Sequence, residues 1–242
     1  MTLQEHYYPE SRFGGFTNID GTVIFYNRVQ ALLQPTSIVV DVGCGRGAYF
    51  ADALTHRRNL RILKGKCQKV IGLDPDPRAK DNPFLDEFLP LDGSRWPLDD
   101  SSADLCLADN VLEHVESPAD FFSECRRILK TGGVLCIRTP NLLSYFGLFS
   151  KLIPNRQHGQ WLSKVKDTQG EDIFPTFYRC NTLPSLRRAF REHGFEAYVY
   201  GYEAEPSYLS FSRLTYLLGV LHQRLAPQLL RVGLHGFGRK IG

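Results

Sequence analysis

Runs of β-branched and aliphatic residues recur along the chain, and the first of them end in an acidic residue. The run that starts at Ser37 ends at Asp41, and the run that starts at Lys69 ends at Asp74. Short apolar runs bounded by turn residues are typical of strands that are buried on both faces of a sheet. Five further runs predict strands at residues 88–93, 103–108, 134–139, 195–202 and 231–240.

Segments with apolar residues at helical spacing separate these runs. Ser117-Pro118-Ala119-Asp120 combines a capping residue, a proline in the first turn and an early acid, and therefore predicts the start of a helix. Asn18 or Asp20 is a candidate cap for an earlier helix that ends near Leu33. Residues 1–16 are rich in aromatic and turn residues and predict no regular element. The other helices are predicted at residues 46–57, 181–193 and 208–225.

A turn with three glycines, Gly43, Gly45 and Gly47, follows Asp41. Because glycine has no Cβ, a bound ligand can approach this backbone closely. The helix predicted behind the turn would present free N–H groups and a positive dipole end. We therefore expect the turn to hold a nucleotide-like cofactor. Two fingerprints fit it: Gly43-x-Gly45-x-x-Ala48, as in dinucleotide sites, and Gly43-x-Gly45-x-Gly47 with an acid two residues ahead.

Asp74 stands at the tip of the second predicted strand. An acid at this position can accept hydrogen bonds from both ribose hydroxyls of a nucleoside that lies across the carboxyl edge of the sheet. In dinucleotide-binding folds this acid comes about 20 residues after the glycines. Here it follows Gly45 by 29 residues, because the basic connection at residues 57–66 lengthens the crossover. The spacing counts mildly against a dinucleotide site.

Five motifs in a fixed order resemble those of the small class I S-adenosylmethionine-dependent methyltransferases. The resemblance is narrower to the branch with a Leu-Glu-His segment after the fourth strand, and it covers roughly Asp41 to Asn141. The motifs are Asp41-x-Gly43-x-Gly45-x-Gly47, Asp74, Asp92-Gly93, Asp104 with Val111-Leu112-Glu113-His114-Val115, and Arg126 to Gly132-Gly133.

The resemblance implies a fold and a domain organisation. The expected fold is α/β: a Rossmann-like, doubly wound, seven-stranded and mostly parallel sheet, whose antiparallel last strand pairs beside the fifth. Residues 1–242 would form one methyltransferase domain. Its expected parts are an N-terminal segment with a leading helix (1–34), a cofactor-binding core (35–140), a lid insertion (141–180) and a C-terminal part (181–242) with a helical insertion near 207–226.

The resemblance also implies S-adenosyl-L-methionine as the cofactor and assigns roles to particular residues. Asp41 and the backbone of Gly43, Gly45 and Gly47 would face the methionine part, and Asp74 would take the ribose hydroxyls. The remaining expected contacts are Asp92 to the adenine amino group, the Gly93 amide to the adenine ring, and the Asn110 carbonyl to the ammonium group.

Methyl transfer to oxygen usually needs a base, whereas a neutral amine does not. His114, just beyond the fourth strand, is the candidate base, and its alternative role is to brace the loop. Tyr145, His158, Tyr178 and Glu205 lie in the more variable half and are candidates to face the substrate. Two alternatives to a methyltransferase stay open, namely an NAD(P)-dependent oxidoreductase and a non-catalytic protein that binds S-adenosylmethionine.

Composition narrows the classes of partner. Lys and Arg (29) nearly balance Asp and Glu (26), and no block of five like charges occurs, so no nucleic-acid partner is expected. The six cysteines form no C-x-x-C pair, which predicts reduced thiols, a cytoplasmic protein and no metal site. We see no signal peptide and no bilayer-spanning run. The aromatic second half favours a small-molecule, glycan or lipid-linked substrate. Peripheral membrane contact through residues 208–225 and the oligomeric state stay open.

Overall fold

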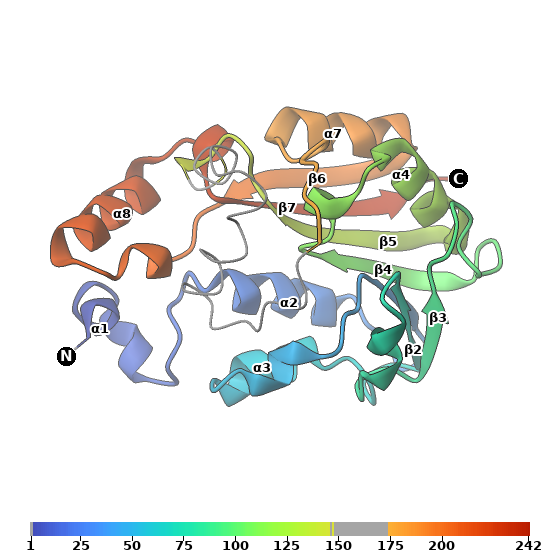
Figure 1. Ribbon diagram of the computed structural model, residues 1–242, viewed down its shortest axis with the longest axis horizontal. Helices are drawn as coiled ribbons and strands as arrows, with labels where there is room; N and C mark the ends of the chain where they lie inside the picture. Colours follow the sequence, from blue (N-terminus) through green and yellow to red (C-terminus); the bar gives the residue numbers. More distant parts are fainter. Residues whose placement is uncertain (1, 146, 148–173) are drawn as a thin grey trace.

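A computed structural model gives the fold, and it describes residues 2–145, 147 and 174–242. Its described strands form one seven-stranded sheet in the order β3-β2-β1-β4-β5-β7-β6 (Figure 1). The strands are β1 Ile38–Val42, β2 Lys69–Asp74, β3 Glu87–Pro90, β4 Ala103–Asp109, β5 Leu129–Pro140, β6 Phe195–Tyr202 and β7 Gly233–Lys240.

Strand direction confirms the predicted fold class. Strands β1 to β5 pair in parallel, and β7 pairs antiparallel with both β5 and β6. The last strand therefore lies beside the fifth, as expected. The order of strands reverses between β1 and β4, and in open α/β sheets ligands bind at the carboxyl ends of the strands on either side of such a switch point.

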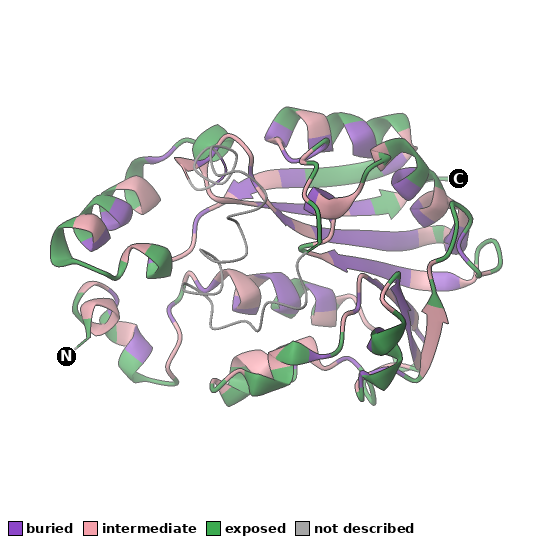
Figure 2. Cartoon of the chain, viewed as in Figure 1, coloured by how far each residue is buried: buried purple, intermediate pink, exposed green. Residues whose placement is uncertain are grey.

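Helices cover both faces of the sheet (Figure 1). Two hydrophobic clusters explain this layering, because successive strand residues point to opposite faces. Val39 packs in the cluster with α2 and α3, whereas Val40 packs in the cluster with α4 and α7. Figure 2 shows that buried residues dominate the central strands. The helices that cover the two faces are α2 Gly21–Ala31, α3 Thr55–Arg61, α4 Pro118–Ile128 and α7 Leu183–Glu192.

The helix predicted to precede the first strand is α2, and its N-cap is Asp20, one of the two candidate caps. The Asp20 carboxylate accepts hydrogen bonds from the amides of Thr22 and Val23, both at 2.9 Å. The prediction that residues 1–16 are irregular is wrong, because α1 spans Leu3–Tyr7. The signal was present in the sequence: Thr2 and Glu5 form a capping box, which supplies partners for two amides at the helix start.

The prediction of one helix at residues 46–57 is also wrong. The chain forms a short 3-10 helix at Ala48–Ala51 and becomes extended at Asp52, and α3 begins only at Thr55. The Asp52 carboxylate accepts the Leu54 amide at 3.0 Å, which stabilises the turn between the two pieces. No α-helix N-terminus therefore follows the glycine turn directly. The other 3-10 helices are Pro9–Arg12, Pro77–Asp81, Leu112–His114, Ser207–Leu209 and Gln228–Leu230.

Helix α8, Arg213–Leu225, is inserted between β6 and β7 and packs beside α1 at one end of the molecule (Figure 1). Its contact with the N-terminal segment centres on Tyr8, Tyr216 and Val220. No helix among residues 2–145, 147 and 174–242 is long and apolar enough to cross a membrane. Most of the predicted lid insertion at 141–180 lies outside the described residues.

A buried ion pair joins three elements next to the switch point. The Arg138 guanidinium on β5 donates to both carboxylate oxygens of Asp109 on β4, at 2.6 and 2.7 Å. The Tyr26 hydroxyl of α2 donates to Asp109 at 2.9 Å, and Arg138 also donates to Thr22 at 2.6 Å. Burial alone would raise the pKa of Asp109, but Arg138 holds it below its usual value.

Replacing Asp109 by Asn will destabilise the protein by about 3–5 kcal/mol at pH 7, because a buried guanidinium loses its charge partner. Urea unfolding measures the loss. Because the pKa of Asp109 is lowered in the folded state, the stabilisation is lost as the pH falls through the acid range, so the gap between wild type and variant will narrow there.

The matched control is Glu87→Gln, which removes one carboxylate from the half-exposed Lys69–Glu87 pair. This change will cost less than about 1 kcal/mol. Equal losses in the two variants would contradict the importance of the buried pair.

Candidate active site

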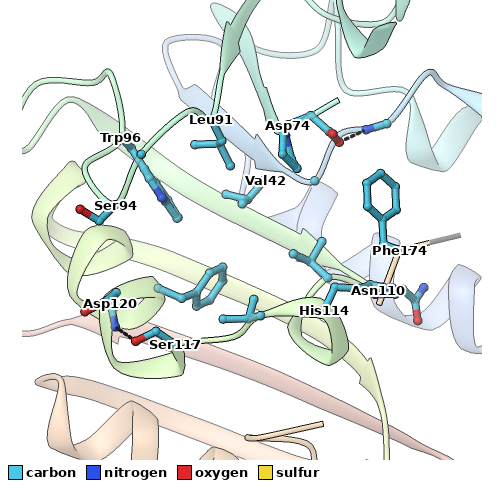
Figure 3. A pocket seen from close by; sticks show the side chains of 17 residues that line it. Val42, Asp74, Leu91, Ser94, Trp96, Asn110, His114, Ser117, Asp120 and Phe174 are labelled. Carbon is cyan, nitrogen blue, oxygen red and sulfur yellow. Dashed lines mark hydrogen bonds between the residues drawn. The ribbon is translucent and has the colours of Figure 1, made fainter. Parts of the chain in front are cut away.

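A cavity of about 430 Å³ opens at the carboxyl ends of β1, β2 and β4. Its size is within the usual range for small-molecule sites. The lining comes from the glycine turn, the loops after β2, β3 and β4, and the start of α4 (Figure 3). The cavity therefore lies at the switch point, where the topology places a ligand.

Asp74 ties two of these loops together. One of its carboxylate oxygens accepts the Gly45 amide at 2.9 Å (Figure 3), and the other accepts the Asp76 amide at 2.8 Å. The carboxylate lines the cavity although the residue is only 5% exposed. Each oxygen keeps a second lone pair, so Asp74 can still accept hydrogen bonds from a ligand.

Two glycines of the turn have different functions. A Cβ on Gly45 would meet no atom within 4 Å, so the open space above it leaves room for a ligand at backbone distance. A Cβ on Gly47 would lie 2.8 Å from the Asn82 side-chain oxygen, and its φ of +75° suits glycine. Gly47 is therefore needed for the turn itself, whereas Gly45 and the similarly open Gly93 border the cavity.

The carboxylates of Asp74 and Asp109 lie close enough to Asp41, beside the glycine turn, to raise its pKa. Burial, together with the charges of Asp109 and Asp74, raises the pKa of Asp41 to about 7, and Arg61 only partly opposes this rise. The Arg61 guanidinium stacks over the Tyr49 ring at 4.5 Å, and its buried Nε atom has no hydrogen-bond partner. The raised pKa shows that the fold compensates the charge of Asp41 only in part.

The ring of His114 is held in a defined orientation. Its Nδ1 lies 2.9 Å from the carbonyl oxygen of Pro175. A carbonyl can only accept, so Nδ1 carries the proton, and Nε2 of the neutral ring is left as a proton acceptor. The Glu113 carbonyl accepts the amides of Phe177 and Tyr178, at 2.7 and 3.2 Å, and so fixes the segment that contains Pro175.

The structure brings only part of the predicted cofactor set to the cavity. Gly43, Gly45, Asp74, Gly93 and Asn110 line it, and so does the candidate base His114. Asn110 has a φ of +57°, a conformation that asparagine tolerates better than most residues.

Three predicted cofactor residues do not line the cavity. Asp41 lies beneath the turn and contributes through its charge, and Gly47 shapes the turn. Asp92 is exposed, because β3 already ends at Pro90 and the chain turns outward. Its neighbours Leu91 and Gly93 line the cavity instead.

None of the candidate substrate residues that the structure describes lines the cavity. The Tyr145 ring packs edge-on against His222 of α8 at 5.0 Å. Glu205 accepts a hydrogen bond from the Thr17 hydroxyl at 2.8 Å, and Tyr178 takes part in the backbone contact to Glu113. His158 lies outside the described residues.

An apolar wall of the cavity went unpredicted. It consists of Trp96, Phe121 and Phe174, and the Trp96 and Phe121 rings meet edge-on at 5.8 Å. Trp96, six residues beyond the end of β3, was the available signal, because tryptophan suits a surface that is apolar on one side and polar on the other.

The chain is similar to known methyltransferases in sequence and in fold. Residues 40–137 match the sequence model of a family described as "Methyltransferase domain". An uncharacterized methyltransferase of Mycobacterium leprae is 29% identical over 156 residues, which are 57% of this chain and 53% of that protein. A Mycolicibacterium smegmatis protein named "Probable S-adenosylmethionine-dependent methyltransferase" is 34% identical over 113 residues, or 44% of this chain and 39% of that protein.

The chain spans about half the length of the M. leprae relative. Among solved structures, a SAM-dependent methyltransferase from Archaeoglobus fulgidus superposes with a TM-score of 0.56 over 96% of this chain and 97% of that chain. At 16% sequence identity, this similarity concerns the fold alone.

The strand order and the glycine turn at the carboxyl edge define a Rossmann-like domain, and its fold is similar to that of solved SAM-dependent methyltransferases. Within residues 40–137 the sequence is similar to methyltransferase domains, among them that of the M. smegmatis protein.

Replacing Asp41 by Asn will stabilise the ligand-free protein by about 1–3 kcal/mol at pH 8 and by less at pH 5. The pKa of Asp41 in the folded state, about 7, lies above that of an unfolded aspartate. The wild type therefore loses stability as the pH rises towards and through 7, and the variant does not. Urea unfolding at several pH values measures the difference. Asp99→Asn, on an exposed loop, is the control, and an equal gain at both pH values would contradict the assignment.

Proposed function

We propose that this protein transfers a methyl group from S-adenosyl-L-methionine to an oxygen or nitrogen atom of its acceptor. The observation that carries the proposal is the position of Asp74. Its carboxylate faces the cavity at the switch point and is held there by the amide of Gly45, the glycine with open space above it. This is the arrangement that a nucleoside with a charged tail requires.

The residues of the site fit the cofactor part by part. Asp74 would accept from the ribose hydroxyls, and the Gly93 amide would reach the adenine ring. The charges of Asp41, Asp74 and Asp109 favour an ammonium group near the glycine turn. Asn110 and Asp92 keep their predicted roles as proposals, although Asp92 has no support from the cavity lining. When bound, the cofactor supplies a methyl group that its sulfonium has already activated.

The protein's own contribution is alignment, exclusion of water and proton removal. The wall of Trp96, Phe121 and Phe174 shields the cavity from solvent. We propose that Nε2 of His114 takes the proton of an acceptor hydroxyl, while the Pro175 carbonyl stabilises the charged ring through Nδ1. This pairing of a base with an orienting acceptor is the arrangement on which general-base catalysis relies.

The acceptor that we propose is a small molecule, a glycan or a lipid-linked compound, because the cavity wall is largely aromatic and apolar. The six unpaired cysteines support our placement of the protein in the cytoplasm. The two hydrophobic clusters, which share the one sheet, support a single domain. An oxidoreductase is disfavoured by the family match and by the spacing of Asp74.

Calorimetric titration with S-adenosylhomocysteine, with NADH in parallel, tests the cofactor. The wild type will bind the first ligand and not the second. Asp74→Ala will weaken binding by about 100-fold or more, because two hydrogen bonds to a carboxylate are lost. The control is Asp76→Ala, which removes a neighbouring carboxylate that does not line the cavity. Binding of NADH instead, or an unchanged affinity in a folded Asp74→Ala protein, would overturn the proposal.

Replacing His114 by Asn will lower kcat by about 10²–10⁴-fold for an acceptor hydroxyl. It will also remove the acidic limb of the pH–rate profile and leave the Kd of S-adenosylhomocysteine unchanged. Transfer of a radiolabelled methyl group to a panel of acceptors gives the rates. His56→Asn, an exposed histidine stacked on Phe16, is the control. If the pH–rate profile stays the same in the His114→Asn protein, His114 only braces the loop. If the folded wild type binds the cofactor and methylates no acceptor, the non-catalytic alternative is favoured.

A further inference from the structure

Helix α8 carries a continuous apolar stripe that faces solvent. Leu214, Leu218 and Leu225 are 68%, 56% and 77% exposed, and Leu217 and Leu221 complete the stripe at helical spacing. The turns on both sides extend it with further exposed apolar residues, namely Tyr208, Phe211, Leu229 and Leu230. Single exposed leucines are ordinary, but a contiguous patch of this kind marks a contact surface.

The stripe does not result from poor packing of the helix. On its opposite side, α8 buries Tyr216 and Val220 against Tyr8, and the Tyr216 ring meets Tyr7 at 5.6 Å. Ser212 caps the helix by accepting the Thr215 amide at 3.1 Å. The helix is therefore anchored in the orientation that turns its leucines outward.

The charges that α8 and its flanking turns themselves carry all have one sign. Residues 206–242 contain no Asp or Glu, whereas Arg213 and Arg224, at the two ends of α8, are exposed. With 100° of rotation per residue, both arginines lie on the same flank of the stripe. Apolar residues on one face and arginines beside them are the pattern of helices that lie in the interface of an anionic bilayer.

Topology places α8 on the same edge of the sheet as the cavity. Because β6 and β5 are both antiparallel to β7, β6 runs parallel to β5 and ends at the carboxyl edge, where the cavity opens. The chain between the end of β6 and the start of β7 forms α8 (Figure 1). A surface that contacts α8 therefore lies at the end of the molecule towards which the cavity's strands point.

We infer that α8 and its flanking turns bind the surface of a membrane that contains anionic lipids. The leucine stripe enters the boundary between headgroups and acyl chains, and Arg213 and Arg224 contact lipid phosphates. At 13 residues the helix is too short to span a bilayer, so it lies in the interface. A second copy of the chain fits less well, since pairing two such stripes would bring arginines together with no Asp or Glu in residues 206–242 to balance them.

Flotation with phosphatidylcholine vesicles, with and without phosphatidylglycerol, tests this inference. The full chain will float with the phosphatidylglycerol vesicles, and salt will weaken its binding. Leu214→Gln with Leu218→Gln will reduce partitioning by on the order of tenfold or more. Arg213→Glu with Arg224→Glu will weaken binding to the anionic vesicles by more than about fivefold per arginine, because each charge is reversed. The matched charge control is Arg188→Glu with Arg191→Glu on the exposed side of α7, which will leave flotation nearly unchanged.

A second measurement keeps the stripe apolar and so avoids loss of the fold. A tryptophan introduced by Leu218→Trp will be quenched by brominated lipids, whereas one introduced by Tyr198→Trp, at a 70% exposed position on β6, will not. Wild type that stays unbound in the presence of phosphatidylglycerol would overturn the inference. The inference would also be overturned if light scattering shows a wild-type dimer that Leu214→Gln with Leu218→Gln converts to a monomer, because the stripe would then bind a second copy of the chain. Vesicle binding needs no cofactor, so its failure is distinct from a failure of methyl transfer.

Discussion

The pair between Asp109 and Arg138 is the contact on which the site depends. It joins the carboxyl ends of β4 and β5 next to the switch point and, through Tyr26, attaches α2 to them. Two charges away from water are stable only when each has a well-oriented partner, and here every part of the pair is also hydrogen-bonded. The relative positions of β4, β5 and α2 at this edge of the sheet therefore depend on a strong and directional contact.

The same pair also sets the electrostatics of the cavity. Asp109 keeps its negative charge because Arg138 lowers its pKa, and this charge, together with burial and Asp74, raises the pKa of Asp41 to about 7. Deprotonation of Asp41 therefore costs stability in the ligand-free protein.

Much of the fold could be predicted because it depends on local pattern. The apolar runs gave the strands, the acids at their ends marked the carboxyl edge, and Asp20 marked the start of α2. The errors have local causes as well. Asp52 interrupts a helix-compatible segment by accepting the Leu54 amide, and the capping box of Thr2 and Glu5 starts a helix in a region without periodicity. Both effects depend on local hydrogen bonds between side chain and backbone, which periodicity does not register.

The site was less predictable, because its side chains come from segments far apart in the sequence. Phe174 lies at the cavity because Glu113 fixes the segment that follows it, whereas Asp92 does not line the cavity, because β3 ends at Pro90. Tyr145, a candidate to face the substrate, packs edge-on against His222 of α8. Pattern locates the edge of a sheet, but the direction of each side chain at that edge depends on tertiary contacts.

The contact between His114 and the Pro175 carbonyl links two parts of the chain that are free to vary independently. The ring belongs to the loop after β4, whereas the carbonyl that orients it belongs to the return of the chain after β5. A change in the conformation of that return segment would therefore also turn the ring. One backbone oxygen thus couples the segment after β5 to the orientation of a side chain that borders the cavity.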